Sequence, residues 1–304
     1  MDIIIGIDLG TTFSCVGYWA DDHVVICENN QGKKTTPSWV FFDEDEILIG
    51  EAAKRKAMKK PQNVLFDIKR IIGKKYYDES VQDDLENLPF KMKSDKNGMP
   101  LIEVDGKNYR AEQISGLVLS HMKEIAENKI GQKINKAVIT VPAYFNDSER
   151  KATRDACTIA GMECVKIINE PTAACLCYGL QETNEDKKIL IFDLGGGTFD
   201  VSLLNLSDGV FEVLATAGNT HLGGEDFDYI LMNYLINEFE KENNVNIRGS
   251  KKTLRMFKKE AERCKCVLSN SNYVEIELDN VYLGNDFYMK LLYNGLEIVV
   301  IFFT

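Results

Sequence analysis

Two stretches of the sequence carry the same unusual pattern, and they constrain the fold more than any other feature. Residues 190–201 read LIFDLGGGTFDV: an apolar run reaches Asp193, breaks into three glycines and a threonine, and resumes as an alternating strand. Glycines allow a tight turn and present bare N–H groups to a ligand. The nearby carboxylates of Asp193 and Asp200 favour a cation or its water shell. The pattern is typical of a turn that grips a metal-bound polyphosphate; the alternative is a glycine-rich hairpin with incidental acids.

The second copy lies near the N-terminus, where residues 3–17 read IIIGIDLGTTFSCVG. It also has an apolar strand, an Asp-Leu-Gly break, a hydroxyl-rich turn and a returning strand. Asp8 corresponds to Asp193. Two matched copies so far apart in the chain predict two similar lobes, each of which presents a phosphate-binding hairpin to a shared cleft.

Length and charge narrow the class of protein. A chain of 304 residues is longer than one ordinary core, which agrees with two lobes. The net charge of −11 argues against nucleic acid and anionic membranes as partners. No apolar run reaches the roughly 18 residues of a membrane span. The N-terminus lacks the basic region of a signal peptide, so we expect a cytoplasmic protein, and we expect it to be a monomer.

The chain has eight cysteines, which we expect to be reduced thiols in a cytoplasmic protein of this length. Two pairs, Cys175/Cys177 and Cys264/Cys266, have Cys-x-Cys spacing and suggest zinc. Both pairs fall in predicted helices, where residues i and i+2 point to different faces, so packing explains them better.

Helices and strands alternate along the chain, as an α/β fold requires. The apolar run 64–73 predicts a short helix, in which Lys69 either points inward or joins a solvated face. Glu170 lies at a strand-to-helix junction, where functional residues of α/β layers collect; the helix dipole alone also favours a carboxylate there. Other helices are predicted at 51–60, 111–130, 146–161, 228–242 and 251–268, and other strands at 24–28, 38–42, 137–141, 165–168, 210–215 and 273–278.

Six stretches together resemble the ATPase domain of the seventy-kilodalton heat-shock proteins of the eukaryotic cytosolic type. They are residues 6–12, 66–70, 141–148, 167–174, 191–202 and 220–228, and the resemblance covers the chain from about residue 3 to Tyr288. It implies an α/β, actin-like and ribonuclease H-like ATPase fold, in which two lobes surround a nucleotide cleft.

The resemblance also implies a domain division. The first lobe is residues 1–182, with a core of 1–37 and 110–182 and a peripheral part of 38–109. A partial second lobe is residues 183–290, with a core of 183–223 and a peripheral part of 224–290. Residues 291–304 are expected to be a hydrophobic tail outside the family, so the second lobe is incomplete.

Ligands and site residues follow from the same resemblance: ATP or ADP with Mg²⁺ and K⁺. Lys69 would face the γ-phosphate and the attacking water, which suits a reaction that depends on positioning and charge neutralisation. The catalytic set is Lys69, Asp8, Glu170, Asp193 and Thr198. The metal set is Asp8, Glu170, Asp193 and Asp200. The nucleotide-binding set is Gly10, Thr11, Thr12, Phe13, Gly195, Gly196, Gly197, Thr198, Glu262, Lys265 and Ser269.

The sequence departs from the family pattern at Phe13, which is one of these positions, and at Cys266, which lies beside Lys265. Phe13 replaces a tyrosine, and Cys266 replaces an arginine that stacks on adenine. J-domain cochaperones and nucleotide-exchange factors are the partners that the resemblance implies, with Arg150 on the outer surface near the site where the interlobe linker and J-domains dock. Client peptides would be bound by another domain.

Three alternative functions are compatible with these sequence features. The first is an ATP-hydrolysing chaperone domain whose turnover is impaired by the truncation. The second is a non-catalytic module that binds cochaperones. The third, a sugar kinase or a filament protein of the same fold, does not explain the long heat-shock-type segments.

Overall fold

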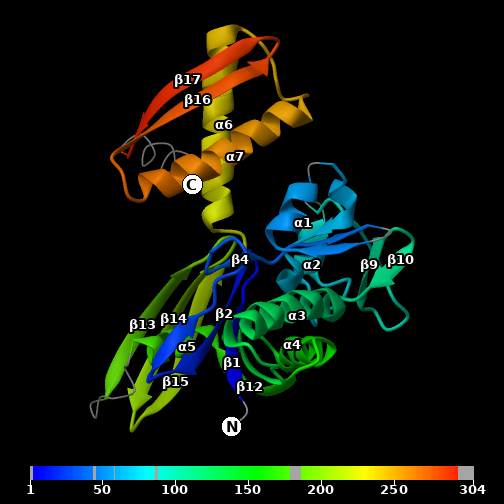
Figure 1. Ribbon diagram of the computed structural model, residues 1–304, viewed down its shortest axis with the longest axis vertical. Coiled ribbons are helices and arrows are strands. Elements are labelled where there is room, and N and C mark those ends of the chain that lie inside the picture. Colours follow the sequence, from blue (N-terminus) through cyan, green and yellow to red (C-terminus); the bar gives the residue numbers. More distant parts are fainter. Residues whose placement is uncertain (1–2, 44–45, 58, 86–87, 179–185, 294–304) are drawn as a thin grey trace. The chain divides into compact units, whose positions relative to one another are not determined.

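The structure, a computed structural model, describes residues 3–43, 46–57, 59–85, 88–178 and 186–293 (Figure 1). The chain forms two compact units. The first comprises residues 1–193 and 200–218, and the second comprises residues 194–199 and 219–304. The predicted lobe boundary at 182/183 lies outside the described residues.

A mixed sheet organises the first unit, with the strand order β12-β11-β1-β2-β3 and with β4 paired to β2. β1 runs parallel to β11 and antiparallel to β2, so the predicted N-terminal hairpin is confirmed. The strands are β1 (Ile4–Leu9), β2 (Phe13–Ala20), β3 (His23–Ile26), β4 (Thr36–Pro37), β11 (Lys136–Val141) and β12 (Glu163–Asn169).

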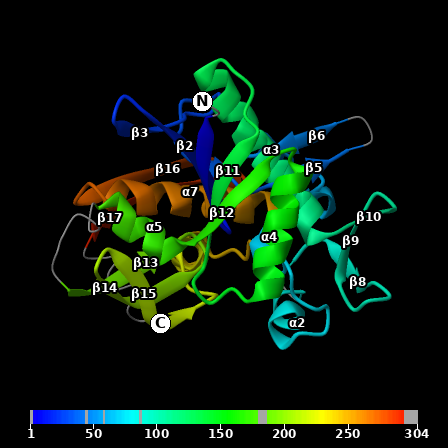
Figure 2. The same ribbon diagram turned by 90° about the horizontal axis from the view of Figure 1, so that it is seen from below.

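The alternation of β1 sets the two faces of this sheet. Ile5, Ile7 and Leu9 are buried in the core of the unit, whereas Asp8 is exposed on the opposite side. Helix α3 (Ala111–Ile130) packs on β1 and β2, and α4 (Asp147–Ile159) packs on α3 and β12 (Figures 1 and 2). The period-two pattern that buries Ile7 and Leu9 therefore places the carboxylate of Asp8 on the exposed face of the sheet.

Two smaller sheets complete the peripheral part of the first unit, in the orders β6-β5-β7 and β10-β9-β8. The predicted helix over 64–73 is wrong. Its first residues form strand β7, which pairs with β5, and Ile68–Arg70 form the 3-10 turn η2. The elements here are β5 (Val40–Phe42), β6 (Ile47–Ile49), α1 (Glu51–Lys56), η1 (Pro61–Asn63), β7 (Val64–Leu65), η2 (Ile68–Arg70), α2 (Glu79–Leu85), β8 (Lys91–Ser94), β9 (Pro100–Val104) and β10 (Lys107–Tyr109).

A further three-stranded sheet has the order β13-β14-β15 and contains the second predicted hairpin. Its strands are β13 (Lys187–Leu194), β14 (Phe199–Ser207) and β15 (Val210–Asn219). Leu204 and Leu206 of β14 are buried, whereas Leu190 and Phe192 of β13 are exposed. Helix α5 (Glu170–Cys177) follows β12 directly.

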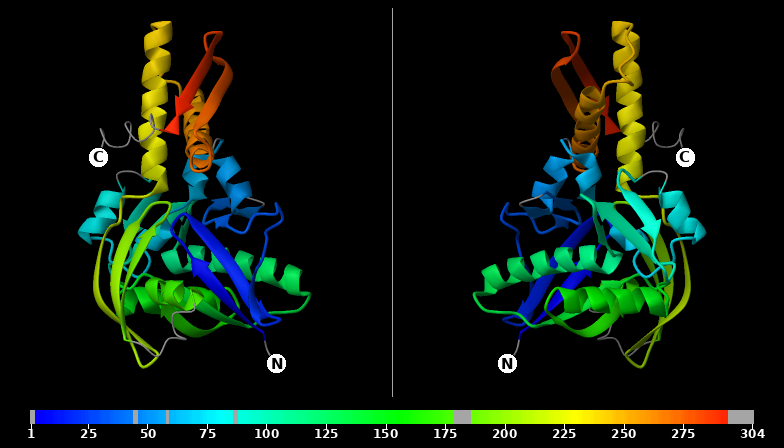
Figure 3. Two further views of the ribbon diagram at one scale, coloured as in Figure 1. Left: turned by 90° about the vertical axis from the view of Figure 1, so that its left-hand side faces the viewer. Right: turned by 90° about the vertical axis from the view of Figure 1, so that its right-hand side faces the viewer.

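The second unit has its own core. Helices α6 (Gly224–Asn243) and α7 (Lys251–Leu268) pack on each other and, through α7, on the hairpin of β16 (Tyr273–Tyr282) and β17 (Asn285–Leu292) (Figure 3). Three rings meet here: Phe239 and Phe257 lie 5.7 Å apart, and Phe287 lies 5.5 Å from Phe257. Leu291, which the sequence analysis assigned to the tail, is buried in this core.

No helix in the described part of the chain is long and apolar enough to cross a membrane.

Candidate functional site

Asp8 is the last exposed residue of β1, and a side chain of the neighbouring strand β11 contacts it. Thr140 of β11 donates a hydrogen bond from Oγ1 to Asp8 Oδ1 at 2.9 Å. The parallel register that pairs Ile7 with Ile139 brings these two residues together. This hydrogen bond therefore fixes the direction of the Asp8 side chain, although Asp8 is exposed to solvent.

The turn after Asp8 has almost no spare room. A Cβ on Gly10 would lie 2.0 Å from the carbonyl oxygen of Phe13, so only glycine fits. Ser38 donates a hydrogen bond from its hydroxyl to the Gly10 carbonyl at 2.8 Å and one from its backbone N–H to the Thr12 carbonyl at 2.9 Å. Within the described residues, the buried Thr12 Oγ1 has no hydrogen-bond partner. A buried hydroxyl in this state suits a turn that receives a polar ligand.

Lys69 is turned inward, as one of the two sequence interpretations expected. Its residue lies in η2, and its Nζ donates to Glu170 Oε1 at 2.5 Å. The two side chains are only 10% and 17% exposed. The pair joins residues that are 101 positions apart in the chain, and it places a cation among acids.

Glu170 is positioned by the junction between β12 and α5. Arg150 of α4 supports this junction: its guanidinium donates to Asn169 Oδ1 at 2.7 Å and to the carbonyls of Phe145 and Ala143 at 2.9 and 3.2 Å. Arg150 is half-buried, and its guanidinium is directed at the loop and the strand end beside Glu170. Its predicted place near the site where the linker and J-domains dock stays a prediction.

Three carboxyl groups near Lys69, those of Glu170, Asp193 and Asp200, have a raised pKa. Burial raises the pKa of Glu170, and Lys69 opposes that rise, while Asp8 and Asp193 add to it. The Asp193 carboxyl is accessible to solvent, but the protein packed around it raises its pKa, and Asp8 raises it further. The pKa of Asp200 is raised by burial and by Asp193. The excess of negative charge favours a bound cation.

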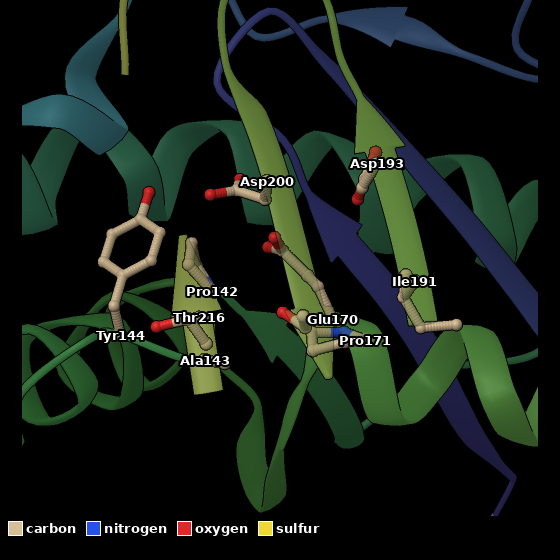
Figure 4. A pocket seen from close by; sticks show the side chains of 10 residues that line it. Pro142, Ala143, Tyr144, Glu170, Pro171, Ile191, Asp193, Asp200 and Thr216 are labelled. Atoms are coloured by element: carbon tan, nitrogen blue, oxygen red, sulfur yellow. The ribbon is translucent and has the colours of Figure 1, made fainter. Parts of the chain in front are cut away.

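A small pocket lies beside these acids (Figure 4). It encloses about 10 Å³, the space of one water molecule, so it is too small to hold a triphosphate. The side chains of Glu170, Asp193 and Asp200 gather at one end of it, as Figure 4 shows. Tyr144 lies at the rim, where burial and then the charges of Asp200 and Glu170 raise its pKa. The other lining residues are Pro142, Ala143, Pro171, Ile191, Ser202 and Thr216.

The carboxyl groups predicted to hold a metal are linked through their charges. In the described ranges, no three His, Cys, Asp or Glu side chains are grouped closely enough to ligate one ion. Mg²⁺ usually keeps several of its waters and takes only one or two carboxylates. Asp8 and Asp193 raise the pKa of Glu170, and Asp8 also raises the pKa of Asp193. The role of these residues in holding the water shell of a magnesium ion stays a prediction.

The glycine turn 195–198 belongs to the second unit and packs on the start of α6. The backbone N–H of Gly195 donates to the Thr198 carbonyl at 2.8 Å, and that of Gly224 donates to the Gly195 carbonyl at 3.0 Å. A Cβ on Gly223 would lie 2.6 Å from the nitrogen of Gly197. The two glycine-rich segments therefore fix each other's backbone.

Lys265 of α7 reaches the same region of the second unit. Its Nζ lies 2.7 Å from Asp228 Oδ1, and it donates to the Gly224 carbonyl at 2.7 Å. The acids of this turn have different partners. Asp226 caps α6, since its Oδ2 accepts from the Gly223 N–H at 2.7 Å, whereas the buried Asp228 pairs with Lys265.

The structure does not test the other predicted contacts of α7 with a nucleotide. Ser269 donates its hydroxyl to the Lys265 carbonyl at 3.1 Å, and Cys266 is exposed. The nucleotide-binding roles of Glu262, Lys265 and Ser269 therefore remain predictions, as do those of Thr11, Phe13, Gly196, Gly197 and Thr198.

Sequence reasoning missed two side chains that support Asp8 and the turn after it: Ser38 and Thr140. Thr140 has a detectable signal, because it stands on the polar side of an alternating strand, two residues before Pro142. Ser38 has none, since no local pattern connects it with Gly10 and Thr12.

The family model and the similar proteins found by comparison all belong to one protein family. A family model described as "Hsp70 protein" matches residues 4–299. Heat shock cognate 70 kDa protein 3 of Dictyostelium discoideum is 52% identical over 94% of this chain and 47% of its own length. Heat shock 70 kDa protein 2 of Paracoccidioides lutzii is 50% identical over 94% of this chain and 44% of its own length. A ribosome-associated molecular chaperone of Eremothecium gossypii is 51% identical over 93% of this chain and 47% of its own length.

This chain thus spans about half the length of the curated relatives that it matches. The match to the family model continues past Tyr288 into the terminal stretch that the sequence analysis placed outside the family.

Proposed function

This chain belongs to the Hsp70 family, and from that premise we propose that it binds Mg-ATP and hydrolyses it as the ATPase domain of a molecular chaperone. The observation that carries the proposal is the set of acids around Lys69, whose charges are incompletely balanced. Family membership implies a nucleotide-binding site, and the actin-like α/β fold is the one on which such sites occur in this family.

The charges of the first unit explain why a metal-bound phosphate would be held there. Burial and mutual repulsion raise the pKa of Glu170, Asp193 and Asp200, and Lys69 partly offsets each of these shifts. A hydrated magnesium ion, when bound with the triphosphate, supplies the missing positive charge. The N–H groups of the turn from Gly10 to Phe13 and the Thr12 hydroxyl are proposed to donate to phosphate oxygens.

Lys69 is proposed to position the reacting groups. Glu170 and the η2 turn hold its Nζ in one place, so little rearrangement is needed when a phosphate arrives. Arg150 secures the strand end that carries Glu170. These residues do not form bonds to phosphorus; they align the γ-phosphate with an attacking water and stabilise the charge that develops. Asp8 with Asp200 is proposed to seat potassium.

Partners and cellular location are also proposals. J-domain cochaperones and nucleotide-exchange factors are the expected partners, and the cytoplasm is the expected compartment. Coupling of ATP turnover to client folding would require the parts of the relatives that this chain does not match.

The test is isothermal titration of the purified chain with ATP, in Mg²⁺ and again in EDTA, followed by single-turnover hydrolysis. We expect Mg-dependent binding and slow hydrolysis. Binding without hydrolysis would favour a cochaperone-binding module. The absence of Mg-dependent binding in a chain with a native circular dichroism spectrum would overturn the proposal.

A further inference from the structure

Strand β13 lies at the edge of its sheet and exposes large apolar side chains. Its central residues, 189–192, read ILIF, and within them Leu190 is 65% exposed and Phe192 is 67% exposed. Among the described strands, β14 is the only hydrogen-bonded neighbour of β13 (Figure 1). An edge strand presents a row of backbone N–H and C=O groups that can pair with another chain.

The corresponding strand of the first hairpin is covered. In both hairpins the residue directly before the matched aspartate is apolar, and it is Ile7 in β1 and Phe192 in β13. Ile7 is only 1% exposed. Two residues earlier, Ile5 of β1 is fully buried, whereas Leu190 of β13 is exposed. Strand β1 lies between β11 and β2, and α3 packs on it. The apolar positions that other elements cover in β1 are therefore open to a partner in β13.

The middle of β13 lacks the features that usually keep an edge strand single. Such strands carry a charged residue, a proline or a bulge. Strand β12, at an edge of the first sheet, follows this rule, because the exposed Lys166 stands beside a shift in the strand register. Residues 189–192 contain neither a charge nor a proline. The charges of β13 lie towards its two ends, with Lys187 and Lys188 at the start and Asp193 near the finish.

These charges make β13 complementary to itself. An antiparallel pair of β13 strands, related by a two-fold axis through Leu190, places Lys187 of each copy opposite Asp193 of the other. The apolar residues between them then face one another. Opposite charges and apolar pairs directly across two strands stabilise a sheet, and like charges destabilise it. An axis at Lys188 sets that lysine against its own copy, and an axis at either neighbouring isoleucine loses the ion pairs.

We propose that the partner of this strand is a second copy of the chain, and that two copies associate edge to edge through β13. The β13-β14-β15 sheets of the two copies join into one continuous sheet, with Leu190 on the axis and an ion pair between Lys187 and Asp193 at each end. A two-fold interface closes on itself, so the assembly stops at the dimer. The sequence analysis expected a monomer, and the exposed apolar edge is the feature that favours a dimer instead.

Sedimentation velocity of the purified chain over a series of concentrations tests for the dimer. We expect a reversible equilibrium with a Kd of about 1–100 µM, because the interface is small. Leu190→Lys sets two lysines against each other on the axis and should raise the Kd by about ten-fold or more. Val24→Lys is the matched control: Val24 is a strand residue of the first sheet that is 59% exposed, and its replacement should leave the Kd unchanged.

Disulfide trapping tests the register. Leu190→Cys, in a chain whose exposed Cys177 and Cys266 are replaced by serine, should form a disulfide-linked dimer on mild oxidation, because Cα atoms directly opposite each other lie about 4.5–5.5 Å apart. Lys188→Cys in the same background is the control. Its own copy lies roughly 13 Å away along the strands, beyond the reach of a disulfide. It should be trapped only when it is mixed with Phe192→Cys, since these two positions face each other.

Circular dichroism checks that each variant is folded. A monomer at every concentration, a dimer that Leu190→Lys leaves intact, or equal trapping of Leu190→Cys and Lys188→Cys alone would overturn the proposal. In a monomer, slow alkylation of the Leu190→Cys thiol by iodoacetamide would identify another segment of the same chain as the partner of β13, and fast alkylation would show that nothing covers it. Both results contradict a dimer through this strand.

Discussion

Lys69 is the cation on which the acidic cluster depends. It opposes the raised pKa of Glu170, Asp193 and Asp200, and it lies 2.5 Å from Glu170. Its position could not be derived from the sequence alone, because a helix face and an inward-directed cation fit the run 64–73 equally well. The pairing with Glu170, 101 residues away, decides between them.

Replacement of Lys69 by methionine should lower single-turnover ATP hydrolysis by about 100-fold or more, because a positioned charge is removed from the reacting phosphate. Nucleotide binding should fall much less, since other donors remain. Lys59→Met, at an exposed lysine, is the matched control and should hydrolyse at the wild-type rate. An equal loss in both variants would contradict the role assigned to Lys69.

Asp193→Asn should stabilise the chain at neutral pH while it weakens Mg-dependent nucleotide binding. The folded-state pKa of Asp193 is raised, so its contribution to stability falls as pH rises from the ordinary aspartate value through the raised value. The amide carries no charge and avoids this loss, which should raise the Tm at pH 7 by about 1–3 °C.

Thermal melts at pH 4 and pH 7 check the Asp193 prediction, since the difference between variant and wild type should shrink in acid. Asp83→Asn, at an exposed carboxylate of α2, should leave the Tm unchanged at both values. A lower Tm for Asp193→Asn at pH 7 would show that the carboxylate stabilises the fold.

At the scale of elements, the backbone of the glycine turn 195–198 lies directly against the backbone at the start of α6. Gly223 lies against Gly196 and Gly197, where a Cβ would meet the backbone at 2.6 Å. Two chain segments can approach this closely only where side chains are absent.

Gly223→Ala should therefore displace the turn and cost about 1–3 kcal/mol of stability, as overpacking does. It should also weaken nucleotide affinity if the turn binds phosphate. Gly249→Ala, where a Cβ would meet nothing within 4 Å, is the control and should be tolerated. Urea unfolding and calorimetric titration of both variants measure the two effects. Wild-type affinity in Gly223→Ala would separate the turn from nucleotide binding.

Local sequence patterns predicted some elements correctly and failed where long-range pairing competes. The predicted helix over 146–161 is confirmed as α4, and the Asn146 side chain caps it by accepting from the N–H groups of Ser148 and Glu149. The run 64–73 looks helical by its apolar spacing, yet Leu65 pairs with Val40 of β5. Asp67 then adopts a φ of +58°, which ends any continuous helix. Strand pairing across the sheet outweighs the weak helical preference of a short segment.

The described part of the chain contains a large hydrophobic core in each compact unit, and the first unit has a further small cluster around Phe41, Ala53 and Val64. Ile5, Ile139 and Ile114 belong to the first, and Phe239 and Phe257 belong to the second. No buried residue is shared between these two clusters within the described part of the chain. Such cores can unfold as independent cooperative units.

Phe239→Ala should destabilise the second unit by about 3–5 kcal/mol, because it removes a fully buried ring from the cluster with Phe257 and Phe287. Hydrogen exchange measured by mass spectrometry should show faster exchange in α6, α7 and the β16–β17 hairpin, with β1 and β11 unchanged. Tyr229→Ala, at an exposed ring of α6, is the control. Faster exchange throughout the chain would indicate a single cooperative unit.

The sequence by itself determined the features that depend on neighbouring residues. These are the alternation that exposes Asp8, the glycine turns, the helix cap at Asn146 and the repeated Asp-Leu-Gly pattern that predicts two phosphate-binding hairpins. Only the tertiary structure decided which distant side chains meet. Lys69 reaches Glu170, and Thr140 reaches Asp8 across 132 residues. Such contacts depend on strand register and helix packing, which bring together residues that no local pattern connects.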